Sequence, residues 1–71
     1  MKKYYVEYTN GDCDFVKAST DNIAYRKSCK MAKEYNTKIS YLSEIEVDED
    51  DEIVGEDRII IKDGKEIQIN I

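Results

Sequence analysis

Histidine, proline and tryptophan are absent from this 71-residue sequence, and the lack of histidine excludes the most. Histidine is the usual acid/base group near neutral pH and the commonest side chain in metal sites. With only three glycines, the chain has neither a glycine-rich phosphate loop nor a G-x-S-x-G motif. Because no nucleophile, base and orienting group can be assembled by spacing, we expect a protein that is not an enzyme, with no catalytic residue, metal site or cofactor.

Long apolar stretches and a cysteine framework are also missing. The first residues, MKKYYVE, contain no stretch long enough for a secretory signal or a membrane span. Cys13 and Cys29 have no C-x-x-C spacing and fit a reducing compartment as free thiols. We therefore expect a cytoplasmic protein without a membrane partner.

Alternation patterns along the chain predict a single small α+β domain over residues 1–71. The expected order is a β-hairpin, a helix, a strand and a second β-hairpin, which gives a mainly antiparallel twisted sheet with one helix packed on one face. A chain of this length holds one core, which buries only ~60% of the surface that the unfolded chain exposes.

Residues 4–18 predict the first hairpin, because Tyr and Val alternate with polar residues on both sides of Asn10-Gly11. This pair favours a two-residue type I′ turn, and the turn sets the register of the two strands. In that register Val16 lies on the face that is at least partly wet. The residues expected on the core face are Val6, Tyr8, Cys13 and Phe15.

A helix is predicted from Ile23 to Tyr35, after the N-cap residues of segment 19–22. The side expected to face the sheet carries Ala24, Ser28, Met31, Ala32 and Tyr35, with Tyr25 on its flank. The opposite side is basic and carries Arg26, Lys27, Lys30 and Lys33. This basic row is either the solvated side of an amphipathic helix or a contact surface for nucleic-acid phosphates, with bases stacking on Tyr4, Tyr5 or Tyr41.

A third strand is predicted over residues 39–47 and a second hairpin over residues 58–71, around Asp63-Gly64. A two-residue loop would divide the isoleucines of this hairpin between both faces, whereas a three-residue loop with Gly64 in a G1 bulge gathers most of them on one face. Burial favours the second register, which leaves only Ile60 pointing outward. The isoleucines expected on the buried face are Ile59, Ile61, Ile67, Ile69 and Ile71.

The net charge of -5 conceals a division along the chain. Up to Ser43, eight bases outnumber five acids, whereas from Glu44 onward eleven acids outnumber three bases. Between Glu44 and Asp57 there are nine acids and no base. Like charges crowded into a short loop repel each other, so this segment does not stabilise the fold.

Three interpretations of the acidic segment are open: a solvated loop, a docking surface for a basic partner, and a weak divalent-cation site. The last is the least favoured, because the segment lacks the spacing of an EF-hand loop. Ile53-Val54 interrupts the acids, either as a strand continuation or as an apolar pair suited to a groove edged by Lys and Arg. The expected partner-binding residues are Glu44, Glu46, Asp48, Glu49, Asp50, Asp51, Glu52, Ile53, Val54, Glu56 and Asp57.

No motif of a known family is present. In size, acidity and layout the chain is similar to small proteins of phages and mobile elements, some of which inhibit nucleic-acid-handling machines by presenting carboxylates where phosphates would sit. This resemblance implies an inhibitor that mimics nucleic acid and docks on a basic protein surface, such as that of a nucleic-acid-binding protein. Direct nucleic-acid binding through the basic helix face is the less favoured alternative, because the acidic segment repels phosphates. We expect a monomer or a weak dimer.

Overall fold

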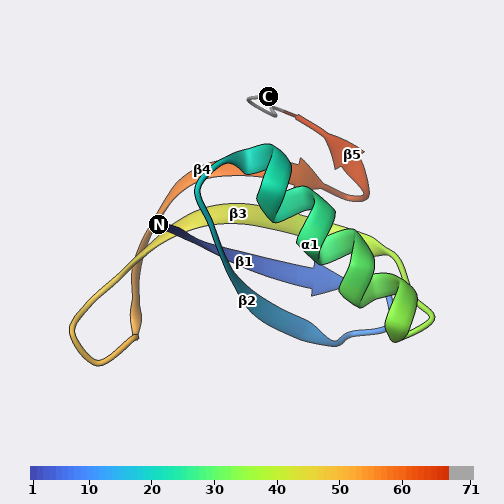
Figure 1. Ribbon diagram of the computed structural model, residues 1–71, viewed down its shortest axis with the longest axis horizontal. Helices are drawn as coiled ribbons and strands as arrows, with labels where there is room; N and C mark the ends of the chain where they lie inside the picture. The colour runs from blue at the N-terminus through green and yellow to red at the C-terminus, as the bar shows by residue number, and fades with distance from the viewer. Residues whose placement is uncertain (68–71) are drawn as a thin grey trace.

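The computed structural model describes residues 1–67 (Figure 1). The elements in chain order are β1 (Lys2–Tyr8), β2 (Cys13–Ala18), α1 (Asp21–Glu34), β3 (Ile39–Val47), β4 (Ile53–Lys62) and β5 (Lys65–Glu66). These strands form one antiparallel sheet in the order β2-β1-β3-β4-β5. Helix α1 lies across one face, here called the inner face, and leaves the outer face uncovered by a helix. The predicted small α+β architecture is confirmed.

Helix α1 begins two residues earlier than predicted, at Asp21, because Thr20 caps it. Thr20 Oγ1 accepts a hydrogen bond from the backbone N–H of Ile23 at 3.2 Å. Tyr35, expected in the buried face, is 45% exposed and packs edge-on against Tyr8, with ring centroids 5.5 Å apart. The buried residues of the helix are mostly small, which lets α1 approach the sheet closely; they are Asp21, Ala24, Ser28 and Ala32.

The first hairpin has a different turn from the predicted one. Gly11 N–H donates to the Tyr8 carbonyl at 3.1 Å, and Tyr8 N–H donates to the Asp12 carbonyl at 2.8 Å, which closes a three-residue loop. Gly11 has a φ of 94°, the left-handed position of a G1 bulge. The prediction of a type I′ turn is therefore wrong, and the register moves by one residue, so that Glu7 lies opposite Cys13.

This one-residue change reverses the two faces of β2. Cys13 and Phe15, predicted in the core, are exposed, and Phe15 is 63% exposed. Val16, predicted on the wet face, is buried in the core. The prediction for β1 is confirmed, because both Val6 and Tyr8 are buried.

The second hairpin has a shorter loop than predicted, whereas the first has a longer one. Asp63 and Gly64 have φ values of 54° and 77°, and the strands pair directly on either side of them. The loop is therefore a two-residue type I′ turn, and the predicted G1 bulge is wrong. Ile67, expected to be buried, is 58% exposed. Ile69 and Ile71 lie outside the described residues.

Ile60, predicted to point outward, is fully buried because β4 is bulged against β3. Leu42 pairs with Ile61 and Ser43 pairs with Ile59, so that Ile60 is an additional residue between the two pairs. A bulge of this kind interrupts the alternation of side chains along a strand. Both Ile60 and Ile61 consequently belong to the core, whereas Ile59 is only half-buried.

Two further register shifts bend the rest of β4, where Asp57 and Val54 are the additional residues. Each bulge increases the local twist of the strand pair. In Figure 1, β3 and β4 curve away from α1 and end in a protruding loop at the lower left. We call residues 46–57, which comprise this loop and the adjoining strand ends, the acidic arm.

The core lies between α1 and the inner face of the sheet. Its buried cluster consists of Tyr4, Val6, Tyr8, Val16, Ala18, Ala24, Ala32, Leu42, Ile60 and Ile61. The acidic arm, all of which is described, contributes no residue to this cluster. The core therefore supports the arm, and the arm adds little to the core.

Candidate functional site

The loop of the acidic arm is organised by Asp48. Asp48 Oδ1 accepts hydrogen bonds from the backbone N–H groups of Asp50 and Glu52, each at 2.9 Å. The backbone N–H of Asp48 donates to the Glu52 carbonyl at 3.0 Å, and that of Asp51 donates to the Asp48 carbonyl at 3.2 Å. The Asp48 carboxylate is therefore committed to holding the loop and is less available to a partner.

Asp51 connects the arm to the body of the protein. Its Oδ1 lies 2.5 Å from Lys3 Nζ on β1, and this hydrogen bond lowers the pKa of the Asp51 carboxyl. Lys3 alternates on β1 with the buried Tyr4, so the contact places Asp51 beside the outer face of the sheet. The arm and the sheet border a depression of about 290 Å³ lined by Lys3, Phe15, Val16, Lys17, Val47 and Asp51.

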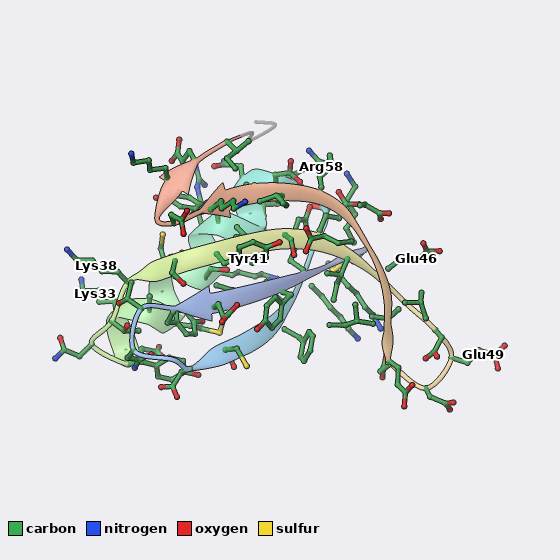
Figure 2. The ribbon with its side chains drawn as sticks, turned by 180° about the vertical axis from the view of Figure 1, so that it is seen from behind. Lys33, Lys38, Tyr41, Glu46, Glu49 and Arg58 are labelled. Atoms are coloured by element: carbon green, nitrogen blue, oxygen red, sulfur yellow. The ribbon has the colours of Figure 1, made fainter. Side chains whose placement is uncertain are left out.

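The remaining carboxylates of the arm are exposed. Within residues 1–67, no cation pairs with Glu46, Glu49, Asp50, Glu52 or Asp57. In Figure 2, Glu46 and Glu49 lie at one end of the molecule and Lys33 and Lys38 at the other. These two lysines are thus far from the arm, whereas Lys3 and Lys17 lie beside it.

Ile53 and Val54 sit among these carboxylates. They form the first two residues of β4, as a strand continuation requires, and they are also 49% and 60% exposed. The pair therefore continues a strand and is also exposed, while its role towards a partner stays a prediction. An exposed pair of β-branched side chains surrounded by acids offers a partner an apolar centre with a charged rim.

Glu44, also expected in the partner-binding surface, is engaged within the fold. Its Oε1 accepts hydrogen bonds from Arg58 Nη2 at 2.7 Å and from Arg58 Nε at 3.2 Å. Arg58 Nη2 also donates to Asp21 Oδ1 at 2.6 Å, and the Tyr4 hydroxyl donates to the same oxygen at 2.7 Å. These four residues, which we call the ion cluster, join β1, α1, β3 and β4.

The ion cluster is largely removed from water. The Asp21 side chain is 1% exposed and that of Arg58 is 24% exposed. Burial and, to a lesser extent, the hydrogen bond to Asp21 raise the pKa of Tyr4 above its ordinary value. The hydrogen bonds to Asp21 and Glu44 raise the pKa of Arg58. A buried ion needs its partners, so the cluster specifies how the helix and the strands meet.

Sequence reasoning misses the ion cluster. Asp21 belongs to a segment rich in N-cap residues, and it appears there only as a helix-start signal. Arg58 is the first base after nine acids, which is the one signal that could have indicated a structural ion pair. The spatial meeting of the two depends on the register of β4, which the sequence pattern does not predict.

Glu56 is also engaged within the protein. The Tyr41 hydroxyl donates to Glu56 Oε2 at 2.6 Å, and burial together with this bond raises the pKa of Tyr41 to about 12. On the outer face the Tyr41 ring lies 6.4 Å from that of Tyr5, which lies 5.7 Å from that of Phe15. An aromatic row therefore crosses β2, β1 and β3 on the side away from α1.

The alternative nucleic-acid site is not brought together. Its basic residues on α1, namely Arg26, Lys27, Lys30 and Lys33, are exposed as predicted. Tyr4, however, is fully buried, and Tyr5 and Tyr41 lie on the outer face, with the sheet between them and the helix. Base stacking and phosphate contacts would thus fall on opposite sides of the sheet.

Acidic and cysteine side chains do not gather into a metal site in the part of the chain that the structure describes. Within residues 1–67, no three Asp, Glu or Cys side chains are placed to hold a metal ion. Cys13 is exposed and Cys29 is half-buried, and both are free thiols. No helix in the described chain is long and apolar enough to cross a membrane.

Comparison with known proteins adds no relative. No family model, curated protein or solved structure matches this chain. The role of the acidic arm is therefore argued from its geometry and charge alone.

Proposed function

We propose that this protein acts by binding another protein and that the acidic arm is the surface that it presents to a basic patch of its partner. One observation carries the proposal: exposed carboxylates without cationic partners surround the exposed pair Ile53 and Val54 on a protruding strand pair. Like charges collected in this way repel each other and add nothing to the core. In a small domain, a feature that costs stability is a candidate for function.

The chemistry of the arm matches a partner rich in Lys and Arg. Carboxylates steer such a surface into contact, and the apolar pair provides a centre from which water is excluded. A nucleic-acid-binding protein presents this kind of surface, because it collects Lys and Arg where phosphates bind. On this proposal the arm carboxylates occupy phosphate positions, and the protein inhibits its partner by competing with nucleic acid.

A charge-reversal variant must avoid the carboxylates that hold the fold. Asp48 organises the loop and Asp51 contacts Lys3, so the appropriate variant is Glu49→Lys, Asp50→Lys and Glu52→Lys. A matched control, Glu7→Lys, Glu34→Lys and Glu66→Lys, changes the net charge equally at exposed positions outside the arm.

Affinity capture from the lysate of the native host, at low and moderate salt, tests the proposal. We expect the wild type and the matched control to retain the same basic protein, and the arm variant to lose it. Added nucleic acid should displace that protein from the wild type. The proposal is wrong if the arm variant captures the same protein as well as the wild type does, or if the control loses it equally.

The apolar pair is tested separately. Ile53→Ser with Val54→Ser removes the apolar centre and leaves every carboxylate in place. We expect weaker binding with an unchanged salt dependence, because the number of ionic contacts is the same. Unchanged affinity would show that the carboxylates alone form the docking surface.

A further inference from the structure

A second surface, at the edge of the sheet, is complementary to the acidic arm. An open depression of about 430 Å³ lies between β2 and α1 and is lined by Phe15, Val16, Lys17, Lys27, Lys30, Met31 and Glu34. We call it the basic groove. Phe15 is 63% exposed, and Lys17, Lys27 and Lys30 are exposed around it. The groove therefore has an apolar centre and a mainly cationic rim.

The backbone edge beside the groove is protected in part. Within residues 1–67, no strand pairs with the outer edge of β2. Lys27 Nζ donates to the Lys17 carbonyl at 2.7 Å, which occupies one acceptor on that side and places a cation next to the edge. Lysine at a sheet edge opposes strand addition. Docking on this surface would accordingly depend on side chains.

The acidic arm and the basic groove are complementary both in their apolar side chains and in the charge of their rims. The arm presents Ile53 and Val54 within a rim of carboxylates. The groove presents the exposed Phe15, on the outer-face side of β2, and the half-buried Met31 of α1, with Lys17, Lys27 and Lys30 around them. Apolar centres with complementary charged rims are the usual anatomy of a protein interface. Association of arm with arm, or of groove with groove, would instead bring like charges together.

The arm of the same chain borders the groove residues only on the outer-face side, where Val47 and Asp51 share the smaller depression with Phe15, Val16 and Lys17. Asp51 is held there by Lys3, and no residue of the arm lines the part of the groove formed by α1. Ile53 and Val54 line neither depression. A second copy can place its arm there without this constraint.

We infer that the basic groove binds the acidic arm of a second copy of this chain, head to tail. The contact is heterologous, because each copy uses two different surfaces, so it can propagate beyond a dimer. The inference rests on the proposed function in that the arm must be a docking surface. A foreign basic protein would then compete with the second copy for the same arm.

Two variants, each with one surface blocked, test this arrangement. The first is the arm variant defined above; the second, Lys17→Glu with Lys30→Glu, reverses the groove and leaves the contact made by Lys27 in place. Sedimentation equilibrium at low salt should show a wild-type mass that rises with concentration and falls as salt is added. Each variant alone should be monomeric, with association weakened roughly tenfold or more.

Mixing the two variants gives the decisive result. The mixture uses neutral forms, Glu49→Gln with Asp50→Asn and Glu52→Gln for the arm and Lys17→Gln with Lys30→Gln for the groove, because two reversed surfaces would attract each other. One form then retains only its groove and the other only its arm, so an equimolar mixture should form a 1:1 complex and nothing larger. A wild type that is monomeric at every concentration overturns the inference. Self-association of either variant at the wild-type level also overturns it, because the contact would then be symmetric or elsewhere. If either variant unfolds, the corresponding Gln substitutions replace it.

These experiments distinguish failure of the head-to-tail contact from failure of the proposed function. The groove variant has an intact arm, so it should still capture a foreign basic partner. A monomeric wild type whose foreign partner is lost on arm reversal leaves the proposed function standing without self-association. Self-association without any foreign partner would leave only the head-to-tail contact.

Discussion

The paired strands β3 and β4 contain two regions of opposite character. The inner region places Leu42, Ile60 and Ile61 under α1 and closes the ion cluster around Arg58, whereas the acidic arm extends its carboxylates into solvent. Acids occur in both regions. In the inner region they contact a guanidinium, and in the arm most of them contact no described cation. The same residue type therefore fixes the fold in one region and is available for binding in the other.

The register shifts of β4 produce this difference. The bulge at Ile60 turns two consecutive isoleucines into the core, and the next, at Asp57, lies just beyond the ion cluster. Past that point the strand pair leaves the area covered by the helix. The comparison predicts that substitutions in the inner region change stability strongly, while those in the arm change binding strongly and stability little.

The largest loss of stability is expected for Arg58→Met. This change leaves the Asp21 carboxylate buried without the guanidinium that contacts it, and breaking such a pair typically costs about 3–5 kcal/mol. A single core of this size supplies about the same total, so the variant should be largely unfolded at 25 °C. Urea denaturation measures the loss. Lys62→Met, an exposed cation on the same strand, is the control, and equal effects would show that the ion cluster has no special role.

A similar or slightly smaller loss is expected for Ile60→Ala. Ile60 is 0% exposed, and truncating a buried isoleucine costs about 2–5 kcal/mol. The neighbouring Ile59→Ala should cost clearly less, because Ile59 is only half-buried. Thermal melts of the two variants decide between the observed bulge and regular alternation. A larger loss for Ile59→Ala would contradict the bulge.

An alkaline limit to stability is expected from Tyr4. Its folded-state pKa is raised above 10.0, so above about pH 10 the unfolded chain releases a proton that the folded protein keeps. The stabilisation is complete below that pH and falls by about 1.4 kcal/mol per pH unit above it. The difference in stability between the wild type and Tyr4→Phe should therefore shrink as the pH rises above 10. A constant gap would show that the hydroxyl does not titrate as the burial indicates.

The sequence predicts the existence and order of the elements, because hydrophobic alternation and the caps are local signals, but not the bounds of the second hairpin: β4 begins at Ile53, five residues before the predicted start, and β5 comprises only Lys65–Glu66. It does not predict the two turns. Asn10-Gly11 and Asp63-Gly64 look alike, yet Asn10 Oδ1 accepts from the Asp12 N–H at 3.0 Å and supports the longer loop. Lys17 offered a clue, since the predicted register would have placed it on the core face beside Phe15.

The three consecutive isoleucines failed as a guide for another reason. Strict alternation along β4 would leave Ile60 exposed. A bulge interrupts the alternation of side chains there, and no distinctive residue marks its position in the sequence. The arm itself is predictable, because a run of acids is visible in the composition. The sequence does not predict which acids make contacts within the fold, because Glu44 and Asp48 differ from the neighbouring acids only in what they contact.

The smallest change in stability is expected in the arm, for Glu49→Lys with Asp50→Lys and Glu52→Lys. These side chains are exposed, and surface substitutions away from special features usually alter the free energy of unfolding by no more than about 0.5 kcal/mol. At low salt the variant should be slightly more stable than the wild type, because three charges that repel the remaining arm acids are removed. This gain in stability should disappear as salt screens the charges.

Asp48→Ala is the contrasting variant within the same loop. It removes one carboxylate but also two hydrogen bonds to backbone N–H groups, and a loss of about 1 kcal/mol should outweigh the relief of repulsion. Urea denaturation at low and high salt separates the two effects. If the triple reversal instead destabilises the protein at both salt concentrations by more than Asp48→Ala does, the exposed carboxylates support the fold, and the distinction between the inner region and the arm fails.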